Sequence, residues 1–486
     1  MKKGIPLLFL LVLFAANASR AQDITEQLYT TYEKYKEPSL QIRRIKYVDL
    51  QPLIARARTN PKYKVQKVGE SIEGRDLTLI SLGEGEIDVF LWSQMHGDEP
   101  TATQAIFDIL NFFTSTDFET EKDQILSRVT LHFLPMLNPD GAEVYERRNA
   151  LGIDINRDAL RLQSPEGRTL KRIRDSLEAD FGFNLHDQSR YYNAERTPKP
   201  ATISYLATAY NYEKDINLVR ERAMKVIVFM NNIIQKYAPG QVGRYSDAFE
   251  PRAFGDNIAK WGTSLILIES GGYVNDREKQ EIRKLNYVSM LSALHAIATG
   301  AYETIPIKEY EKIPRNDRKL FDLKITNLTY ELLGNPYILD LGIQRQEIDL
   351  SGHSDFYFKS IIVDQGDLST YFGYETFDAT GYTVVAPAFT NSDQPSISLS
   401  NAKDLLQRGI AYRSTTSPEM GFSTATPIHQ IKTPKQLPDF RLAVGQNPTF
   451  FLKKENVITH AVINGFLIDL TKPLKGQYLG NALIYR

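Results

Sequence analysis

The chain has 486 residues, of which 42% are hydrophobic and 11% aromatic, which is enough for a large folded core and more than one domain. Its formal net charge is -1, and no local run of basic residues is long enough to predict a nucleic-acid partner. The sequence contains no cysteine, which excludes disulfides and thiolate metal ligands. Any zinc site must therefore use histidine and carboxylate side chains.

The first residues have the pattern of a secretory signal peptide. Lys2 and Lys3 precede an apolar run at 5–16, and small residues suitable for cleavage follow it. The run is too short to favour a membrane span, so an uncleaved anchor is the less favoured alternative. We expect residues 1–21 to be a signal peptide. The mature chain, beginning near Gln22, is expected to be secreted or periplasmic and to have no membrane span.

Residues 23–93 have the periodicity of two helices followed by three strands. The expected helices lie at 25–37 and 47–58. The expected strands lie at 64–71, 76–82 and 88–93, with a turn at 72–75 that joins the first two as a hairpin.

The third strand leads into His96 and Glu99, which are followed by apolar residues at helical spacing over 101–113. Open α/β sheets bind ligands at the carboxyl ends of their strands. Zinc accepts an imidazole nitrogen and a carboxylate oxygen at about 2.0–2.2 Å, and a tight turn would bring both side chains to one ion. Alone, such a pair is more often a surface feature or a helix cap than a metal site.

Strands and helices alternate through residue 299. The strand at 129–137 contains His132, which we interpret as a packed core histidine, and 138–141 is expected to be a turn. Further helices are expected at 164–180, 213–237 and 277–299, and further strands at 181–188 and 261–272. This alternation predicts an α/β fold, a three-layer α/β/α arrangement with a mixed, mostly parallel central sheet. His186 and Glu269 end two of its strands, so both can meet His96 in one crevice.

The second half of the chain has a different character. Residues 301–318 form a charged stretch with two prolines, which we interpret as a linker. Short apolar runs between Gly, Pro, Asn and Ser then predict a small sandwich or barrel. We therefore expect a catalytic domain at 22–305 and a smaller all-β accessory domain at 306–486. His353, His429 and His460 are scattered through it, and we interpret them as structural.

In the order of its motifs, the chain resembles the zinc metallocarboxypeptidase family of the carboxypeptidase A type, and in particular its bacterial secreted members. The resemblance covers roughly residues 40–300. Six motifs carry it in the family order: 68–75, the pair His96 and Glu99, 138–141, Arg147 with 154–157, His186, and 268–269.

The resemblance implies one zinc ion held by His96, Glu99 and His186, with a fourth position left for water. The other implied roles are Asp154 orienting His96, Glu269 as general base, Arg147 as oxyanion stabiliser, and Asn156 with Arg157 as the binding pair for the substrate's terminal carboxylate. Arg148 is an alternative to Arg147. Tyr245 is the nearest match to the family's mobile tyrosine, although its spacing differs, and 253–256 does not define a side-chain preference.

These residues lead us to expect an exported zinc carboxypeptidase that acts on peptides or cell-wall peptides. One alternative is an amidase acting on peptidoglycan stem peptides, favoured by export and by the loop residues Arg190 and Arg196. A deacylase of N-acyl amino acids is another. A non-catalytic peptide- or glycan-binding protein is the alternative from a different class, and the intact set of ligands argues against it.

Overall fold

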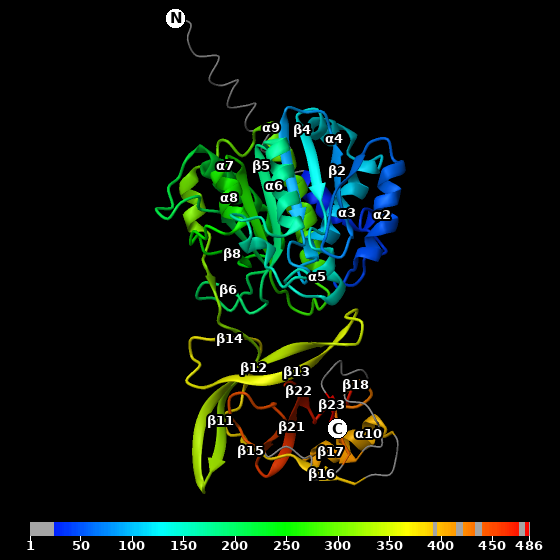
Figure 1. The fold of residues 1–486 in the computed structure, drawn as a ribbon. Helices are drawn as coiled ribbons and strands as arrows, with labels where there is room; N and C mark the ends of the chain where they lie inside the picture. Colours follow the sequence, from blue (N-terminus) through cyan, green and yellow to red (C-terminus); the bar gives the residue numbers. More distant parts are fainter. Residues whose placement is uncertain (1–23, 392–395, 415–420, 433–439, 476–481, 486) are drawn as a thin grey trace, which may run out of the picture. The chain divides into compact units, whose positions relative to one another are not determined.

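The computed structural model describes residues 24–391, 396–414, 421–432, 440–475 and 482–485. The expected signal peptide lies outside the described residues. The chain divides into two compact units, one that ends at Arg318 and one that comprises Lys319–Arg486 (Figure 1). Within the described residues, no helix combines the length and the apolar character needed to cross a membrane.

The first unit is built on an eight-stranded sheet with the order β1-β2-β4-β3-β5-β9-β7-β8. Its strands are β1 Lys64–Glu70, β2 Asp76–Leu82, β3 Ile87–Ser93, β4 Val129–Leu134, β5 Phe181–Asp187, β7 Ile203–Ala207, β8 Val242–Arg244 and β9 Ser264–Ser270. The four central strands β4, β3, β5 and β9 run parallel to one another. Strands β1, β2 and β7 are attached by antiparallel pairing, so the sheet is mixed and mostly parallel, as predicted.

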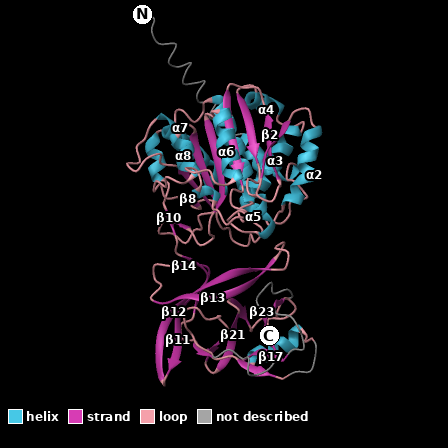
Figure 2. Cartoon of the chain, in the orientation of Figure 1, coloured by secondary structure: helices cyan, strands magenta, loops and turns pink. Residues whose placement is uncertain are grey.

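Helices cover both faces of this sheet (Figures 1 and 2). Residues 24–31 are helical, and the helices that follow are η1 Tyr32–Lys34, α2 Tyr47–Thr59, α3 Thr101–Thr114, α4 Glu119–Leu126, α5 Pro139–Val144, η2 Ile155–Arg157, α6 Pro165–Leu177, α7 Leu218–Tyr237, α8 Phe254–Lys260 and α9 Gln280–Thr299. Apolar side chains of α2, α3, α7 and α9 pack on one face, and those of α6 and α8 pack on the other. The predicted three-layer α/β/α arrangement is therefore confirmed.

Two helix starts differ from the prediction because of capping side chains. Residues 138–141 begin helix α5 and are not an isolated turn: the Asn138 side chain accepts a hydrogen bond from the Gly141 amide, and Pro139 is the first helical residue. Asparagine followed by proline is a signal for a helix start. Helix α7 begins at Leu218, later than expected, because the Asn217 side chain caps it by accepting from the Arg220 amide.

The segment that we interpreted as a linker packs on the first unit. It contains η3 Ile307–Lys312 and β10 Asn316–Asp317, and β10 pairs with β6 Asn193–Ala194. Tyr310 is only 1% exposed, and its hydroxyl accepts a hydrogen bond of 3.0 Å from the Ala207 amide. The buried ring of Tyr310 thus attaches this segment to the first unit. The charge and proline content of the segment do not reveal this contact.

The second unit is rich in strands, as predicted, and also contains helix α10 Leu399–Gln407 (Figure 2). Its larger sheet comprises β11 Leu320–Leu332, β12 Asn335–Asp349, β13 Phe356–Gly366, β14 Phe372–Asp378, β15 Thr383–Val385, β20 Phe450–Lys454, β21 Val457–Ile463 and β22 Phe466–Asp469. The smaller sheet comprises β16 Ala388–Thr390, β17 Ile410–Ser414, β18 Gly421–Ser423, β19 His429–Ile431 and β23 Ala482–Tyr485.

Candidate active site

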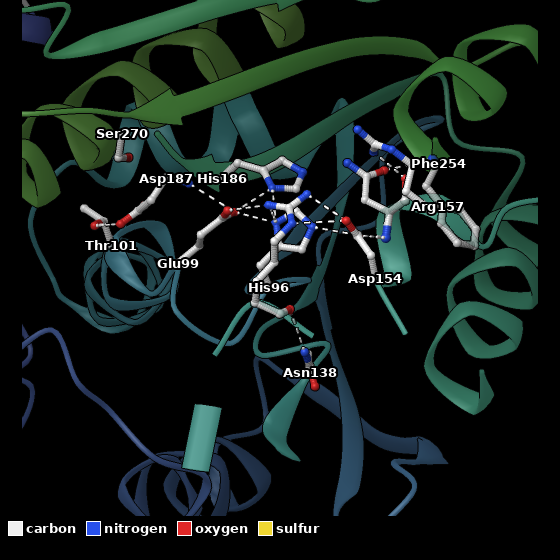
Figure 3. A network of polar contacts seen from close by, with 12 residues as sticks. His96, Glu99, Thr101, Asn138, Asp154, Arg157, His186, Asp187, Phe254 and Ser270 are labelled. Atoms are coloured by element: carbon white, nitrogen blue, oxygen red, sulfur yellow. Dashed lines mark hydrogen bonds and ion pairs between the residues drawn. The ribbon is translucent and has the colours of Figure 1, made fainter. Parts of the chain in front are cut away.

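Three side chains converge at the carboxyl ends of β3 and β5 (Figure 3). Nδ1 of His186 lies 2.7 Å from Oε2 of Glu99, and Nδ1 of His96 lies 2.8 Å from the same oxygen. The two Nδ1 atoms are 3.2 Å apart, and all three residues are buried. Residues that are far apart in the sequence therefore present two ring nitrogens and one carboxylate oxygen to a single point.

The loop between β3 and α3 has a backbone conformation that positions His96. Gln94 has a φ of 50°, in the left-handed region that residues other than glycine rarely adopt. Its side-chain amide donates to the Gly97 carbonyl at 2.9 Å, and its Oε1 accepts from the Thr103 hydroxyl at 3.1 Å. Gly97 must lack a side chain, because a Cβ there would lie 2.0 Å from the Gly141 backbone. The sequence prediction did not include Gln94 as a site residue. Its place two residues before His96 was the one feature of the sequence that could have indicated a role in positioning that histidine.

Burial and mutual interaction shift the pKa of each group in the cluster. Burial disfavours the charged imidazole of His96, but the carboxylates of Glu99 and Asp154 outweigh it and raise its pKa to about 9. Burial also opposes ionisation of Glu99, yet the two histidines hold the pKa of its carboxyl well below the usual range. Burial lowers the pKa of His186. Two imidazoles and one carboxylate are the donors that catalytic zinc sites use, so the residues fit a zinc ion.

Asp154 and Arg147 surround the outer side of His96. Oδ1 of Asp154 lies 3.2 Å from Nε2 of His96, which leaves Nδ1 directed at the cluster. The Arg147 guanidinium donates to Asp154 at 3.0 Å and to Glu99 at 3.2 Å, and it lies 3.1 Å from Nδ1 of His96. Arg148 instead donates to the Gly152 carbonyl and is exposed. The structure thus brings Arg147, and not Arg148, to the cluster.

Glu269 lies beside the cluster on the next strand. It pairs in register with His186 and is 8% exposed. Burial, followed by the neighbouring carboxylates of Glu99 and Asp187, raises the pKa of the Glu269 carboxyl well above its usual value. Such a carboxyl is a candidate for proton transfer, because perturbed carboxyls cluster at functional sites.

Asp187 is a further polar residue of this region, and the sequence prediction missed it. Its Oδ2 accepts from the Thr101 hydroxyl at 2.5 Å (Figure 3). The same oxygen accepts from Nζ of Lys279 at 3.0 Å. These contacts tie the end of β5 to the helices α3 and α9. The position of Asp187 directly after His186 could have indicated that it belongs to the site. Its contact with Lys279 could not be predicted, because the two residues are far apart in the sequence.

The remaining predicted residues lie outside the three-residue cluster. Oδ1 of Asn156 accepts a hydrogen bond of 2.9 Å from the Phe254 amide, and Arg157 lies on the same side (Figure 3). Nε of Arg157 is 3.6 Å from Oε2 of Glu250. The Tyr245 ring packs edge-on against the Tyr192 ring, with the two ring centroids 6.1 Å apart. Burial, and then the Glu269 carboxylate, raises the pKa of the Tyr245 hydroxyl above its usual value.

Part of the chain matches a known family. Residues 51–201 match the family described as zinc carboxypeptidase. Carboxypeptidase SOL1 of Arabidopsis thaliana is 28% identical over 179 residues, which cover 30% of this chain and 36% of that protein. Carboxypeptidase B of Astacus astacus is 38% identical over 80 residues, 16% of this chain and 26% of that protein. The chain thus spans well under two thirds of the length of these relatives.

A solved metallo-carboxypeptidase from Burkholderia cenocepacia is 18% identical, with a TM-score of 0.43 over 52% of this chain and 69% of that chain. The family match extends from α2 to just before β7 and contains His96, Glu99 and His186. Tyr245 and Glu269 lie beyond the matched segment, so their assignment depends on the geometry of the site.

Proposed function

We propose that this chain is a zinc-dependent metallocarboxypeptidase that removes C-terminal residues from peptides. The observation that carries the proposal is the convergence of His96, Glu99 and His186 with Glu269 in register on the adjacent strand. The match of residues 51–201 to the zinc carboxypeptidase family supports the same class of hydrolase. One zinc ion would be held by the two histidines and Glu99.

In this proposal each polar residue has a separate task. A bound zinc ion supplies a Lewis acid that activates water and polarises the scissile carbonyl. Glu269 takes a proton from the attacking water and returns it to the leaving amine; its buried carboxyl has the raised proton affinity suited to the second step. Arg147, which already lies among the acceptor atoms of the cluster, stabilises negative charge on the carbonyl oxygen.

The substrate's terminal carboxylate would be bound by Arg157 and Asn156. A guanidinium is suited to this task because its planar fork can donate two parallel hydrogen bonds to a carboxylate. The 37% exposure of the Arg157 side chain makes it accessible to a ligand. Asp154 would keep the His96 ring oriented through its contact with Nε2. Tyr245 would contact the substrate from the side of Glu269.

A second candidate is an amidase that cleaves cell-wall stem peptides, and the position of Glu250 favours it. Because Glu250 already lies near the Arg157 guanidinium, a substrate carboxylate must compete with an internal one. A substrate bound mainly through other groups would not face this competition. Export of the chain remains part of the proposal and rests on the signal-peptide pattern of residues 1–21.

The two candidates are separated by matched peptides that differ only at the C-terminus, one set ending in a free carboxylate and the other in a carboxamide. The purified chain would be assayed for bound zinc by elemental analysis and for released residues by mass spectrometry. Glu269→Gln should keep its zinc and lose about 100- to 10,000-fold in kcat. Glu146→Gln, which changes an exposed glutamate, is the control.

Stoichiometric zinc and release of single residues from the free-acid peptides alone would support the carboxypeptidase. Equal cleavage of both peptide sets would favour the amidase. The same would follow if muropeptides, assayed in parallel, were cleaved while both peptide sets stayed intact. A chain that binds no zinc would contradict both candidates.

A further inference from the structure

A serine, a histidine and an aspartate form a chain of hydrogen bonds on the sheet of the first unit, away from the zinc-type cluster. Oγ of Ser81 lies 2.8 Å from Nδ1 of His132, and Nε2 of His132 lies 2.9 Å from Oδ1 of Asp88. Ser81 is on β2, His132 on β4 and Asp88 near the start of β3. Because His96 follows the carboxyl end of β3, the two groups lie at opposite ends of that strand.

The direction of the hydrogen bonds follows from the chemistry of the three groups. An ionised carboxylate can only accept, so Nε2 of His132 must carry the proton that is donated to Asp88. In the neutral imidazole, Nδ1 is then an acceptor, and the Ser81 hydroxyl donates to it. The same order is found in the catalytic triad of serine proteases, in which an aspartate fixes the histidine tautomer and the histidine accepts the serine proton. In that triad Nε2 faces the serine and Nδ1 faces the aspartate, whereas here Nδ1 faces Ser81 and Nε2 faces Asp88.

A cationic side chain flanks the serine on the other side. Lys64 of β1 is the direct cross-strand partner of Ser81, and Ser81 is the direct partner of His132. Directly paired residues of antiparallel strands point to the same face of a sheet. Ser81 therefore lies in a row between Lys64 and His132. A lysine ammonium is a group that can stabilise an oxyanion.

This row opens on a groove of about 630 Å³, which is lined by Lys64, Ser81, His132, Arg172 and Ser176, among others. The groove is large enough for a small organic ligand. Lys62, Lys64 and Arg172 also line the groove together with one acidic residue, Glu84, so cationic side chains outnumber the carboxylate. A bound molecule with a carboxylate would thus complement the groove.

We propose that Ser81, His132 and Asp88 form a second hydrolytic site, one that cleaves small acyl esters bearing a carboxylate. Oγ of Ser81 attacks the ester carbonyl carbon while its proton passes to Nδ1 of His132. The C–O bond to the alcohol then breaks, and the alcohol leaves with that proton, which leaves an acyl ester on Ser81. Water attacks this ester, gives a proton to Nδ1, and the C–Oγ bond breaks with return of the proton to Ser81. The products are a carboxylic acid and an alcohol, and Asp88 stays ionised throughout.

The first test is covalent labelling of the zinc-loaded full chain with a fluorophosphonate probe, with the modified residue located by peptide mass spectrometry. We expect the adduct on Ser81. His132→Gln, which removes the base, should slow labelling about 100-fold or more. Ser176→Ala is the matched control, since Ser176 is an exposed serine of the same groove, and its labelling rate should equal that of the unchanged chain.

The second test is ester hydrolysis in a Glu269→Gln background, which removes the proposed general base of the zinc site. 4-Nitrophenyl hemisuccinate should be cleaved faster than 4-nitrophenyl acetate, and Ser81→Ala should abolish both reactions while circular dichroism reports an unchanged fold. The proposal is overturned if the unchanged chain carries no adduct on Ser81, if His132→Gln is labelled at the original rate, or if the Glu269→Gln chain cleaves neither ester.

Discussion

His186 and Glu269 are directly paired residues of the adjacent parallel strands β5 and β9. Neighbouring strands of a sheet lie about 4.8 Å apart, so the backbone ladder and not a loop sets the spacing between a candidate metal ligand and the proposed base. The two strands are buried along their lengths. Rigid elements hold such groups more closely to a productive geometry than loops do.

Replacing His186 by alanine should remove zinc-dependent stabilisation of the chain. A ligand that binds the folded state alone stabilises it by about 4 kcal/mol at a thousand times its dissociation constant. The unchanged chain should therefore melt at a higher temperature with zinc than with a chelator, and His186→Ala should show no such difference. Differential scanning calorimetry measures the effect. His353→Ala, at a partly exposed histidine of the second unit, is the control that should keep the difference. An undiminished zinc effect in His186→Ala would contradict the ligand assignment.

Replacing Asp154 by asparagine should weaken zinc binding while leaving the ligands in place. Asparagine retains an oxygen for the contact with Nε2 of His96 but loses the charge that increases the basicity of the ring. Changes of this kind reduce metal affinity about 10- to 100-fold. Competition with a fluorescent chelator measures the affinity. Asp175→Asn, at a half-exposed carboxylate that pairs with Lys171, should bind zinc as tightly as the unchanged chain. An equal loss in both variants would mean that Asp154 has no specific role.

Much of the first unit could be predicted from the sequence because its central strands are buried on both faces. Such strands have short, almost uninterrupted apolar runs, and the runs around β3, β5 and β9 located the strand ends that carry His96, His186 and Glu269. The convergence of these ends follows from parallel strand direction. The sequence alone could not provide the strand order, which requires pairings between residues far apart in the chain.

The features that the sequence prediction missed depend on individual side-chain contacts. The Asn138 cap converted an expected turn into helix α5, and the buried ring of Tyr310 attached an apparent linker to the first unit. His132 was interpreted as a core histidine; it is buried, but it also lines a groove and contacts two polar side chains. The Asn138 cap is a local contact within α5, for which the Asn-Pro pair was an available signal. The contacts of Tyr310 and His132 join different elements, and local composition does not report such contacts.

Replacing Glu250 by glutamine should lower KM for peptides with a free C-terminus. Oε2 of Glu250 accepts a hydrogen bond of 3.2 Å from Arg252 and lies 3.6 Å from Nε of Arg157. The charge that Arg252 leaves unpaired competes with the substrate's carboxylate for the Arg157 guanidinium. Partly exposed ion pairs of this kind contribute about 0.2–1 kcal/mol, which corresponds to a decrease in KM of up to about fivefold. Steady-state kinetics on carboxylate and carboxamide peptides measure the effect, and kcat should stay unchanged.

Arg157→Lys is the companion variant, and it should raise KM because an ammonium cannot form the two-pronged contact. Arg148→Gln changes an exposed arginine of the neighbouring loop and should leave KM unaltered. If Glu250→Gln had the same KM as the unchanged chain while Arg157→Lys raised it, competition by Glu250 would be excluded. If neither changed KM, Arg157 would not bind the substrate.

The second unit should lose stability in mild acid because of His429. This residue is 0% exposed, its Nδ1 accepts a hydrogen bond of 2.8 Å from the Leu483 amide, and Nε2 lies 2.9 Å from the Thr449 hydroxyl. Burial lowers the pKa of His429 to about 3. The unfolded chain, in which a histidine has a pKa of about 6.5, therefore binds a proton that the folded chain excludes. The stabilisation is complete above pH 6.5 and is lost as the pH falls from 6.5 towards 3, by up to about 1.4 kcal/mol per pH unit.

Nuclear magnetic resonance of the full chain, with carbon-13 in its histidine rings, tests this expectation. The signal that disappears in His429→Gln identifies the residue, and its chemical shift should stay constant between pH 8 and pH 5. The urea concentration that abolishes the folded signals of the second unit should fall between pH 7.5 and pH 5, and it should fall less in His429→Gln, because glutamine takes up no proton on unfolding. A His429 signal that titrates with a midpoint near pH 6 would mean that the ring is accessible to protons in the folded chain, and the acid sensitivity would then have another origin.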